Sequence, residues 1–431
     1  MKRLSKLAAG IAAAGAMIGG TSAFGQADVI VGDITGPAFY GSLNGKTGFA
    51  IGTTSCNIGT VNLDWFQNGT QHPVIAQNIF MIDDDRIMQI GQSWLKHGFC
   101  ALQQGLCGTC TPAGGGCASR LGVGCSDPYS SSLNGSQGGL GPRSEVNAHT
   151  GEYLWPYGSR GQTGNLLFKR AQVDNSFLQP ANHPSAVYVG EGHYVALDDA
   201  AAGNGDNNAS YRMMNRGSAF NDTFRLQWAG QTQRQDPAIF AWRDLGQGVQ
   251  VDADVTIVEA RFPNEGLLFV GNKPRDNGDG TWRYSYAVQN LNSHRSAGSF
   301  SVPVPAGVNV TGIGFHDIDY HSGEPYDNTD WNATRTSDAV TWSSPQTFAQ
   351  NPNSNALRWS TMYTFWFDAD SAPTDADATI VAFRDDSISI GASVQAPESV
   401  EVPCVADYND DGQVNIFDVT AFIADWNRGC P

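Results

Sequence analysis

The chain has 431 residues, with 25 Lys and Arg against 42 Asp and Glu, and its formal net charge is −17 at pH 7. A surface this acidic repels nucleic acids and anionic lipids, so nucleic-acid binding is not expected. The length exceeds one compact core and predicts two domains plus a smaller module. Fifty glycines among abundant Asn, Asp and Ser indicate a mainly β chain.

Residues 1–27 have the three parts of a signal peptide. A basic start (MKRLSK) precedes an Ala- and Gly-rich stretch at residues 7–20, and Gly25 and Ala27 supply the small residues before a cleavage site. A membrane anchor is the alternative, but the apolar stretch is shorter than the roughly 20 residues that cross a bilayer. Cleavage would remove three positive charges and change the net charge from −17 to −20. We therefore expect an exported protein, secreted or at the cell surface, with no transmembrane segment in the mature chain.

The chain contains eight cysteines, and disulfides are the usual state of cysteines in exported proteins. Cys404 and Cys430 bracket the C-terminal segment and are expected to pair with each other. The Cys107-x-x-Cys110 spacing could indicate zinc or redox chemistry, but its Gly-rich surroundings favour structural disulfides. The remaining six cysteines allow fifteen pairings, which the sequence leaves open: Cys56, Cys100, Cys107, Cys110, Cys117 and Cys125.

Residues 28–248 show short apolar runs between Gly and Asn turns and are predicted to form a disulfide-stapled, β-rich domain of open topology. One helix is expected, at residues 83–99 (DDDRIMQIGQSWLKHGF). Ile87, Ile90, Trp94 and Leu95 would share one face, and the Asp-rich start suits an N-cap.

Residues 249–392 contain about seven short segments rich in β-branched and aromatic residues. This spacing predicts an immunoglobulin- or fibronectin-like β-sandwich, with a jelly roll as the alternative. The stretch RDNGDGTW predicts a hairpin turn, since Asn-Gly and Asp-Gly readily adopt positive φ. Residues 393–403 lack a periodic pattern and are predicted to be a linker to the module at residues 404–431.

Two acidic stretches are candidate sites in the body. If residues 317–321 form a strand, Asp317, Asp319 and His321 share one face, and Glu324 follows. Such a set could bind a metal or act in acid–base chemistry, although a polar strand edge running into a turn is the favoured interpretation. The Asp- and Asn-rich loop at residues 198–208 could hold a structural calcium ion, although its spacing fits no defined loop.

The C-terminal segment has oxygen-bearing side chains at the alternating positions of a 12-residue calcium loop. Gly412 occupies position 6, where the chain turns sharply, and Gln413 would contribute its backbone carbonyl. A solvated acidic turn is the alternative. The predicted ligands at positions 1, 3, 5, 7, 9 and 12 are Asp407, Asn409, Asp411, Gln413, Asn415 and Asp418.

This loop, the following VTAFIADW stretch and the flanking Cys404 and Cys430 resemble a dockerin module of the single-repeat, cysteine-bracketed (GC-type) kind, known from exported proteins of planctomycete-like bacteria. The resemblance covers residues 404–431 and implies an EF-hand-like loop–helix unit that binds calcium and docks onto a cohesin-like or cell-surface protein. A full dockerin has two repeats and this chain has one. At the positions that often contact cohesin, the chain carries the apolar Ile416 and Phe417.

No short catalytic motif such as G-x-S-x-G or H-E-x-x-H occurs in the sequence. We therefore predict a calcium-binding protein attached to a surface or scaffold, whose β-rich domains bind a ligand or serve as structure. The alternative is a dockerin-bearing secreted glycoside hydrolase of polysaccharide catabolism, because paired catalytic carboxylates leave no short motif. The sequence identifies no catalytic residue, and a polysaccharide is a possible ligand.

Overall fold

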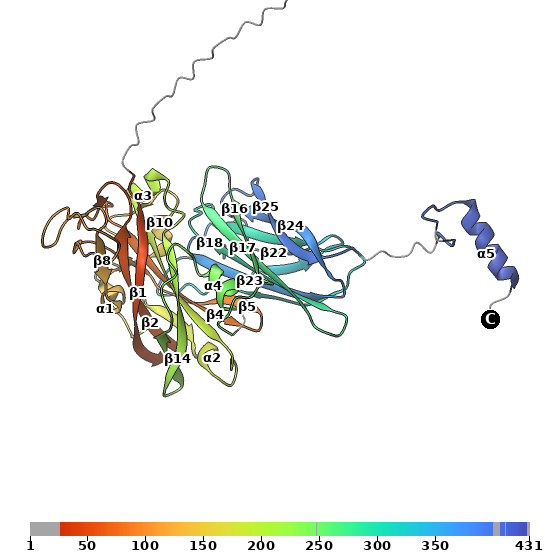
Figure 1. Cartoon of the computed structure of the whole chain (residues 1–431), viewed down its shortest axis with the longest axis horizontal. Helices are drawn as coiled ribbons and strands as arrows, with labels where there is room; N and C mark the ends of the chain where they lie inside the picture. Colours follow the sequence, from red (N-terminus) through yellow and green to blue (C-terminus); the bar gives the residue numbers. More distant parts are fainter. Residues whose placement is uncertain (1–25, 247, 400–405, 410, 429–431) are drawn as a thin grey trace, which may run out of the picture.

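The computed structural model describes residues 26–246, 248–399, 406–409 and 411–428, which are mainly β (Figure 1). The predicted signal peptide, apart from its last two residues, and the predicted Cys404–Cys430 pair lie outside these residues. In the described part of the chain, two β-rich regions precede the C-terminal helix.

The first region has short helices and turns between its strands. The helices are α1 (Ser131–Asn134), α2 (Asn175–Leu178), α3 (Leu197–Ala202) and α4 (Ile239–Leu245), with 3-10 turns η1 (Gln137–Gly139) and η2 (Arg143–Glu145). The strands are β1 (Val29–Leu43), β2 (Lys46–Asn57), β3 (Leu63–Asp64), β4 (Val74–Asp83), β5 (Arg86–Gln92), β6 (Leu95–His97), β7 (Arg120–Leu121), β8 (Ser126–Tyr129), β9 (Leu140–Gly141), β10 (Val146–Asn147), β11 (Glu152–Tyr153), β12 (Ala171–Asp174), β13 (Val187–Val195), β14 (Ala209–Phe220) and β15 (Thr223–Trp228).

Two larger sheets face each other in this region. One has the order β1-β2-β12, with β8 also paired to β2, and the other has the order β15-β14-β13-β4-β6-β9, with β5 also paired to β4. Their facing side chains form a buried cluster in which Phe49 and Val173 of the first sheet pack with Ile79 and Tyr188 of the second. Burial of these apolar side chains stabilises the pairing of the two sheets.

The helix expected at residues 83–99 is wrong. These residues form β5 and β6, and β5 returns antiparallel to β4 after a turn in which Asp84 and Asp85 have φ of 47° and 61°. Every residue from Ile87 to Gln92 is buried, because neighbours cover both faces of the strand. A strand buried on both faces loses the alternation of period two, and its apolar residues then match a helical spacing by chance.

Three disulfides staple the loop around residues 100–125 to β2 and to itself. They join Cys56 to Cys107, Cys100 to Cys117 and Cys110 to Cys125. The disulfide prediction is confirmed for these six cysteines. The redox or zinc interpretation of the Cys107-x-x-Cys110 spacing is wrong, because the two cysteines belong to different disulfides.

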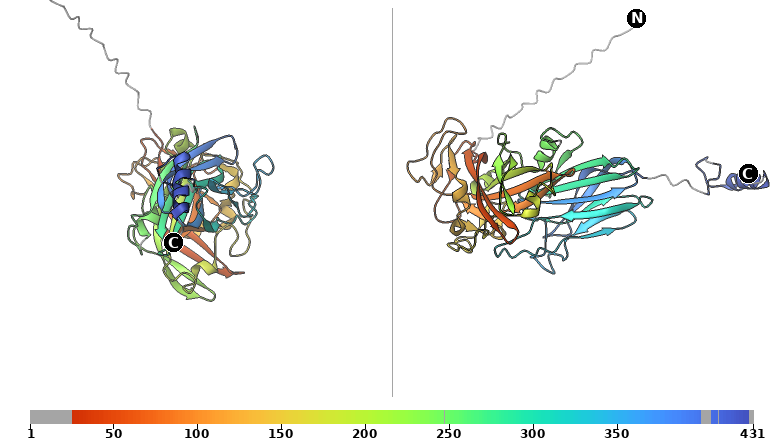
Figure 2. Two further views of the ribbon diagram at one scale, coloured as in Figure 1. Left: turned by 90° about the vertical axis from the view of Figure 1, so that its right-hand side faces the viewer. Right: turned by 90° about the horizontal axis from the view of Figure 1, so that it is seen from below.

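The second region consists of two five-stranded sheets, with orders β16-β17-β18-β23-β20 and β21-β22-β19-β24-β25. Figure 2 shows its strands running alongside one another in layers next to the first region. The strands are β16 (Thr256–Arg261), β17 (Leu267–Asp276), β18 (Trp282–Asn290), β19 (Ala297–Pro303), β20 (Val310–His316), β21 (Asn332–Arg335), β22 (Ala339–Ser343), β23 (Thr361–Ala369), β24 (Pro373–Ala382) and β25 (Ser389–Pro397).

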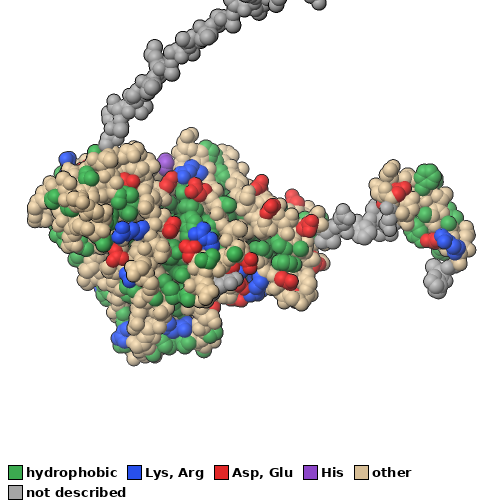
Figure 3. Space-filling model, viewed as in Figure 1, with side chains coloured by type: hydrophobic (Ala, Val, Ile, Leu, Met, Phe, Trp, Pro, Cys, Tyr) green, Lys and Arg blue, Asp and Glu red, His purple; other side chains and the backbone are tan. Residues whose placement is uncertain are grey.

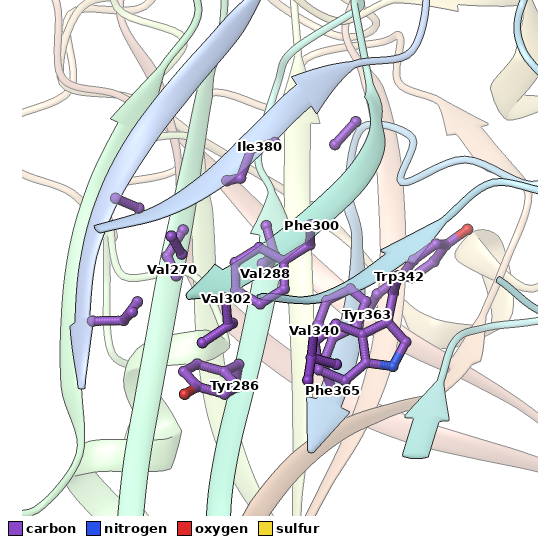
Figure 4. Close-up of a cluster of buried hydrophobic side chains, with 14 of the residues drawn as sticks. Val270, Tyr286, Val288, Phe300, Val302, Val340, Trp342, Tyr363, Phe365 and Ile380 are labelled. Carbon is purple, nitrogen blue, oxygen red and sulfur yellow. The ribbon is translucent and has the colours of Figure 1, made fainter. Parts of the chain in front are cut away.

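An aromatic and aliphatic core fills the space between these two sheets (Figure 4). Val270, Tyr286 and Phe365 come from one sheet, and Phe300 and Trp342 come from the other. The predicted turn in RDNGDGTW is confirmed, since it joins β17 to β18, and Gly278 and Gly280 have φ of 78° and 89°.

The described residues place ten strands in this region, where the sequence predicts about seven. The predicted linker at residues 393–403 also begins too early, because β25 continues to Pro397 and pairs with β24. Val394 and Ala396 are buried in the core. Small residues in GASVQAP hide the alternation of this edge strand, which explains the missed strand.

The two regions share a hydrophobic core. The seam is the contact between the first region, which comprises β1–β15 and α4, and the second region, which comprises β16–β25. Phe80 and Trp242 of the first region pack in one cluster with Leu267, Phe269 and Met362 of the second. The boundary predicted at residues 248 and 249 therefore divides two sets of strands that are packed together. This packing favours their unfolding as a single unit.

The C-terminal helix is α5 (Ile416–Arg428), which is preceded by the acidic loop. No helix in the described ranges combines the length and the apolar character needed to cross a bilayer.

Candidate functional site

Three predicted calcium ligands meet at the start of α5. Asp407, Asp411 and Asp418 each present a carboxylate oxygen, and these oxygens lie within 4.8 Å of one another. In residues 26–246, 248–399, 406–409 and 411–428, this is the one group of three or more His, Cys, Asp or Glu side chains close enough to hold a metal ion. Clustered carboxylates of this kind suit a hard divalent cation such as calcium.

Backbone amides hold two of these carboxylates in place. Asp407 accepts hydrogen bonds from the N–H groups of Asp411 (3.1 Å) and Gly412 (2.7 Å), and Gly412 has the positive φ of 79° that the sharp turn requires. Asp418 accepts from the N–H groups of Asn415 (2.7 Å) and Asn409 (3.3 Å). The hydrogen bond from Asn415 leads the causes that lower the pKa of Asp418, so this carboxylate stays ionised at neutral pH.

The amide ligands predicted from the sequence take part in the turn. The side-chain oxygen of Asn409 accepts from the N–H of Asp411 (3.0 Å), and that of Asn415 accepts from the N–H of Phe417 (2.8 Å). The backbone oxygen of Gln413 accepts from the Asn415 side chain (3.2 Å). Each oxygen has a second lone pair, so each remains able to bind a cation.

The helix after the loop leaves its apolar side chains in solvent, as Figure 3 shows. Ile416 and Phe417 are 66% and 65% exposed, and Trp426 is 71% exposed. Tyr408, Val414 and Phe422 contribute to a hollow of about 300 Å³ beside the loop. Exposed apolar clusters of this kind mark interaction surfaces.

The candidate set around residue 317 does not lie on one strand, although Asp317, Asp319 and His321 line one cavity. β20 ends at His316, so Asp317, Asp319 and His321 lie in an irregular segment, and the shared strand face is wrong. Asp319 pairs with Lys46 at 3.3 Å. Nε2 of His321 is 2.8 Å from the carbonyl oxygen of Gln92.

Glu324 is held by the backbone of the first region. Its carboxylate accepts hydrogen bonds from the backbone N–H groups of Arg143 and Ser144, the second at 3.3 Å. Its role is to fasten the second region to the first across the seam.

A cavity of about 310 Å³ lies at the seam beside residues 316–321. Most of its wall is not predictable from the sequence, because the residues come from β2, β5, β12 and α2, and no local pattern groups them. The lining residues are Lys46, Gln89, Ile90, Gln172, Asp174, Ser176, Phe177, His316, Asp317, Ile318, Asp319 and His321.

Asp317 is the carboxyl group of this cavity that burial perturbs most. Burial raises its pKa to about 7, although a hydrogen bond from the Asn355 side chain opposes the shift. Asn355 is itself held by the hydroxyl of Tyr363, which donates to the Asn355 side-chain oxygen at 2.5 Å. At neutral pH Asp317 is therefore present in both protonated and ionised forms.

We expect Asp317→Asn to reduce the pH dependence of stability between about pH 4 and pH 7. In that window the folded protein keeps a proton on Asp317 that the unfolded chain has lost. Stability therefore falls as pH rises, by up to ~1.4 kcal/mol per pH unit for one proton. The uncharged Asn removes this contribution. Urea unfolding of both proteins at several pH values measures the pH dependence of the free energy of unfolding.

Asp319→Asn is the matched control, because it changes an exposed aspartate two residues away. Its pH profile should stay close to that of the wild type, because burial is the main cause of the raised pKa of Asp317 and the charge of Asp319 is a smaller one. Parallel profiles for wild type and Asp317→Asn would contradict the raised pKa.

The loop at residues 198–208 holds chain segments together. Asp199 accepts from the N–H of Val29 (2.8 Å) and from the Asn208 side chain (2.7 Å), and Asp198 accepts from the N–H of Asp64 (2.8 Å). These contacts anchor β1 and β3, which gives the acidic loop a structural role.

No model of a known protein family matches the chain, and no curated protein matches it in sequence.

Proposed function

We propose that residues 404–431 form a dockerin-like, EF-hand-like calcium module that attaches a β-rich body, with an immunoglobulin- or fibronectin-like second region, to a surface or scaffold partner outside the cell. The observation that carries the proposal is the convergence of the Asp407, Asp411 and Asp418 carboxylates within 4.8 Å. Negative charges on three carboxylates this close repel one another, and a divalent cation would relieve that repulsion. The three disulfides favour an oxidising, extracellular compartment.

In this proposal calcium fixes the loop, and α5 presents the partner surface. Ile416 and Phe417 lie at positions 10 and 11 of the 12-residue loop, in the first turn of α5, so loop geometry sets the direction of the helix that carries them. The side chains of both residues are exposed, and neither is a predicted ligand. A cohesin-like or cell-surface protein with an apolar groove would bury them, as amphipathic helices are buried in many complexes.

Retention of the full chain on its producing cells tests the proposal. Wild-type protein should stay in the cell-bound fraction with calcium and be released by a chelator. Asp407→Ala should weaken calcium binding at least ~100-fold, because it removes a direct ligand of the ion, and should abolish retention. Calorimetry on purified protein measures the calcium affinity, and fractionation of cells measures the retention.

Two further variants separate calcium binding from docking. Ile416→Ser combined with Phe417→Ser should keep calcium binding and lose retention. Asp425→Asn changes an exposed carboxylate of α5 outside the ligand set and should keep both. Equal partitioning of all variants would refute the attachment role, and unchanged calcium affinity in Asp407→Ala would refute the loop as the site.

A further inference from the structure

We propose that the 310 Å³ cavity at the seam binds a neutral, polyhydroxylated molecule of about monosaccharide size. The inference is independent of the calcium module, because every lining residue lies between Lys46 and His321. The volume is at the lower end of the range of small-molecule sites, roughly 300–1,000 Å³. The first region supplies β2, β5, β12 and α2 to the wall, and the second region supplies residues from the 316–321 segment.

Burial keeps the two lining histidines neutral, and hydrogen bonds then assign the position of the ring hydrogen. Nε2 of His316 is 2.8 Å from the carbonyl oxygen of Gln89, so Nε2 carries the hydrogen and Nδ1 is an acceptor. His321 makes the equivalent contact through Nε2, and its Nδ1 accepts from the hydroxyl of Ser322 at 2.9 Å. Burial lowers the pKa of both histidines, that of His321 to about 4. Neither ring therefore brings a positive charge to a ligand.

The charged groups of the wall already have partners. Lys46, the one Lys or Arg among the described lining residues, pairs with Asp319 at 3.3 Å. Asp174 accepts from the N–H (2.9 Å) and the hydroxyl (2.7 Å) of Ser176. An anionic ligand would meet two further aspartates and no unpaired cation. The carboxylates do not converge as a metal site requires, so a neutral ligand fits this wall best.

The wall also offers an apolar face beside its polar groups. Phe177 is half-buried, and its ring is held between His183, stacked at 5.9 Å, and His316, edge-on at 5.5 Å. Ile90 lines the same cavity. A fixed ring beside donors and acceptors can receive the C–H face of a sugar while the polar groups bind its hydroxyls.

Saturation-transfer NMR and calorimetry on the full chain, with a panel of neutral methyl glycosides as probes, test the proposal. Glucuronate and glucosamine are the anionic and cationic comparisons. At least one neutral glycoside should bind, and glucuronate and glucosamine should bind at least 10-fold more weakly. Binding should persist in a chelator, which separates this result from the calcium proposal. Absence of binding by every neutral probe, or preference for a charged one, would overturn it.

Ser176→Trp should block the cavity and weaken glycoside binding at least 10-fold. Ser132→Trp is the matched control, because both serines are exposed at the second position of a four-residue helix and only Ser176 lines the cavity. Phe177→Leu keeps an apolar side chain, removes the flat ring and should weaken binding about 3- to 10-fold. Unchanged affinity in both Ser176→Trp and Phe177→Leu would place the binding elsewhere and refute the assignment.

Discussion

Arg143→Ala is expected to lower the free energy of unfolding by about 3–5 kcal/mol, because it leaves buried acceptors unpaired at the seam. Arg143 is 3% exposed, and its guanidinium donates to the carbonyl oxygens of Ser93 (2.6 Å), Ser360 (3.1 Å) and Gln77 (3.2 Å) and to the side-chain oxygen of Asn78 (2.8 Å). Burial lowers its pKa to about 10, so the group remains charged at neutral pH.

The same substitution tests whether the two regions unfold together. Ser360 belongs to the second region, whereas the other three acceptors belong to the first. We therefore expect one transition, shifted as a whole, in calorimetry and in tryptophan fluorescence. Two separate transitions, with only one displaced, would contradict a shared core.

Arg261→Ala is the matched control for this prediction. Arg261 pairs with Asp206 across the same seam at 2.7 Å, but its side chain is 44% exposed and that of Asp206 is 40% exposed. An exposed ion pair contributes about 0–1 kcal/mol, so the loss should be at most ~1 kcal/mol. The contrast between the two arginines isolates burial as the cause of the larger effect.

Trp342→Ala should lower the free energy of unfolding by about 3–5 kcal/mol through a different mechanism, a cavity between the two sheets. The Trp342 side chain is fully buried, and its ring lies 5.2 Å from that of Phe365 and 6.2 Å from that of Phe300. Its neighbours come from both sheets, so the core has no single side that can collapse into the gap. Chemical denaturation monitored by far-UV circular dichroism measures the loss.

Trp342→Phe is the graded comparison, with an expected loss of roughly 1–2 kcal/mol. The indole Nε1 of Trp342 is buried without a hydrogen-bond partner among the described residues. Phenylalanine therefore gives up ring volume but no hydrogen bond. A loss for Trp342→Phe as large as that for Trp342→Ala would contradict the packing account.

In the second region, the sequence predicts a strand best where apolar residues alternate with polar ones, as in the Ala378–Ile380 part of β24. β24 alternates exposed and buried residues through Ala378 and Ile380, and the same period is visible in the sequence. Prediction from the sequence fails at β5, where residues from Ile87 to Gln92 are all buried. The environment on both sides of a strand is a property of the tertiary structure, which a local pattern does not contain.

The candidate sites also differ in whether local sequence spacing predicts them. The calcium-loop ligands lie within 12 consecutive residues, so their spacing alone predicts that they meet. The seam cavity joins Lys46, Asp174 and His316, which lie more than 100 residues apart in sequence. Pairing of β12 with β2 brings Asp174 to Lys46, and packing of the second region against the first brings His316 to both. The sequence leaves the pairing of the six cysteines open for the same reason, because the same cysteine spacing is compatible with several pairings.

The reach of the seam contacts has a consequence for biosynthesis. The Asn78 side chain donates to Ser360, 282 residues later, and the Gln89 side-chain oxygen accepts from the N–H of Met362, 273 residues later. A ribosome delivers the first region long before these partners exist, so its buried amides and apolar side chains meet water or other chains in the meantime. The growing chain therefore exposes the unpaired groups of the first region until β23 is made. A chaperone that prevents aggregation would have to stay bound until then.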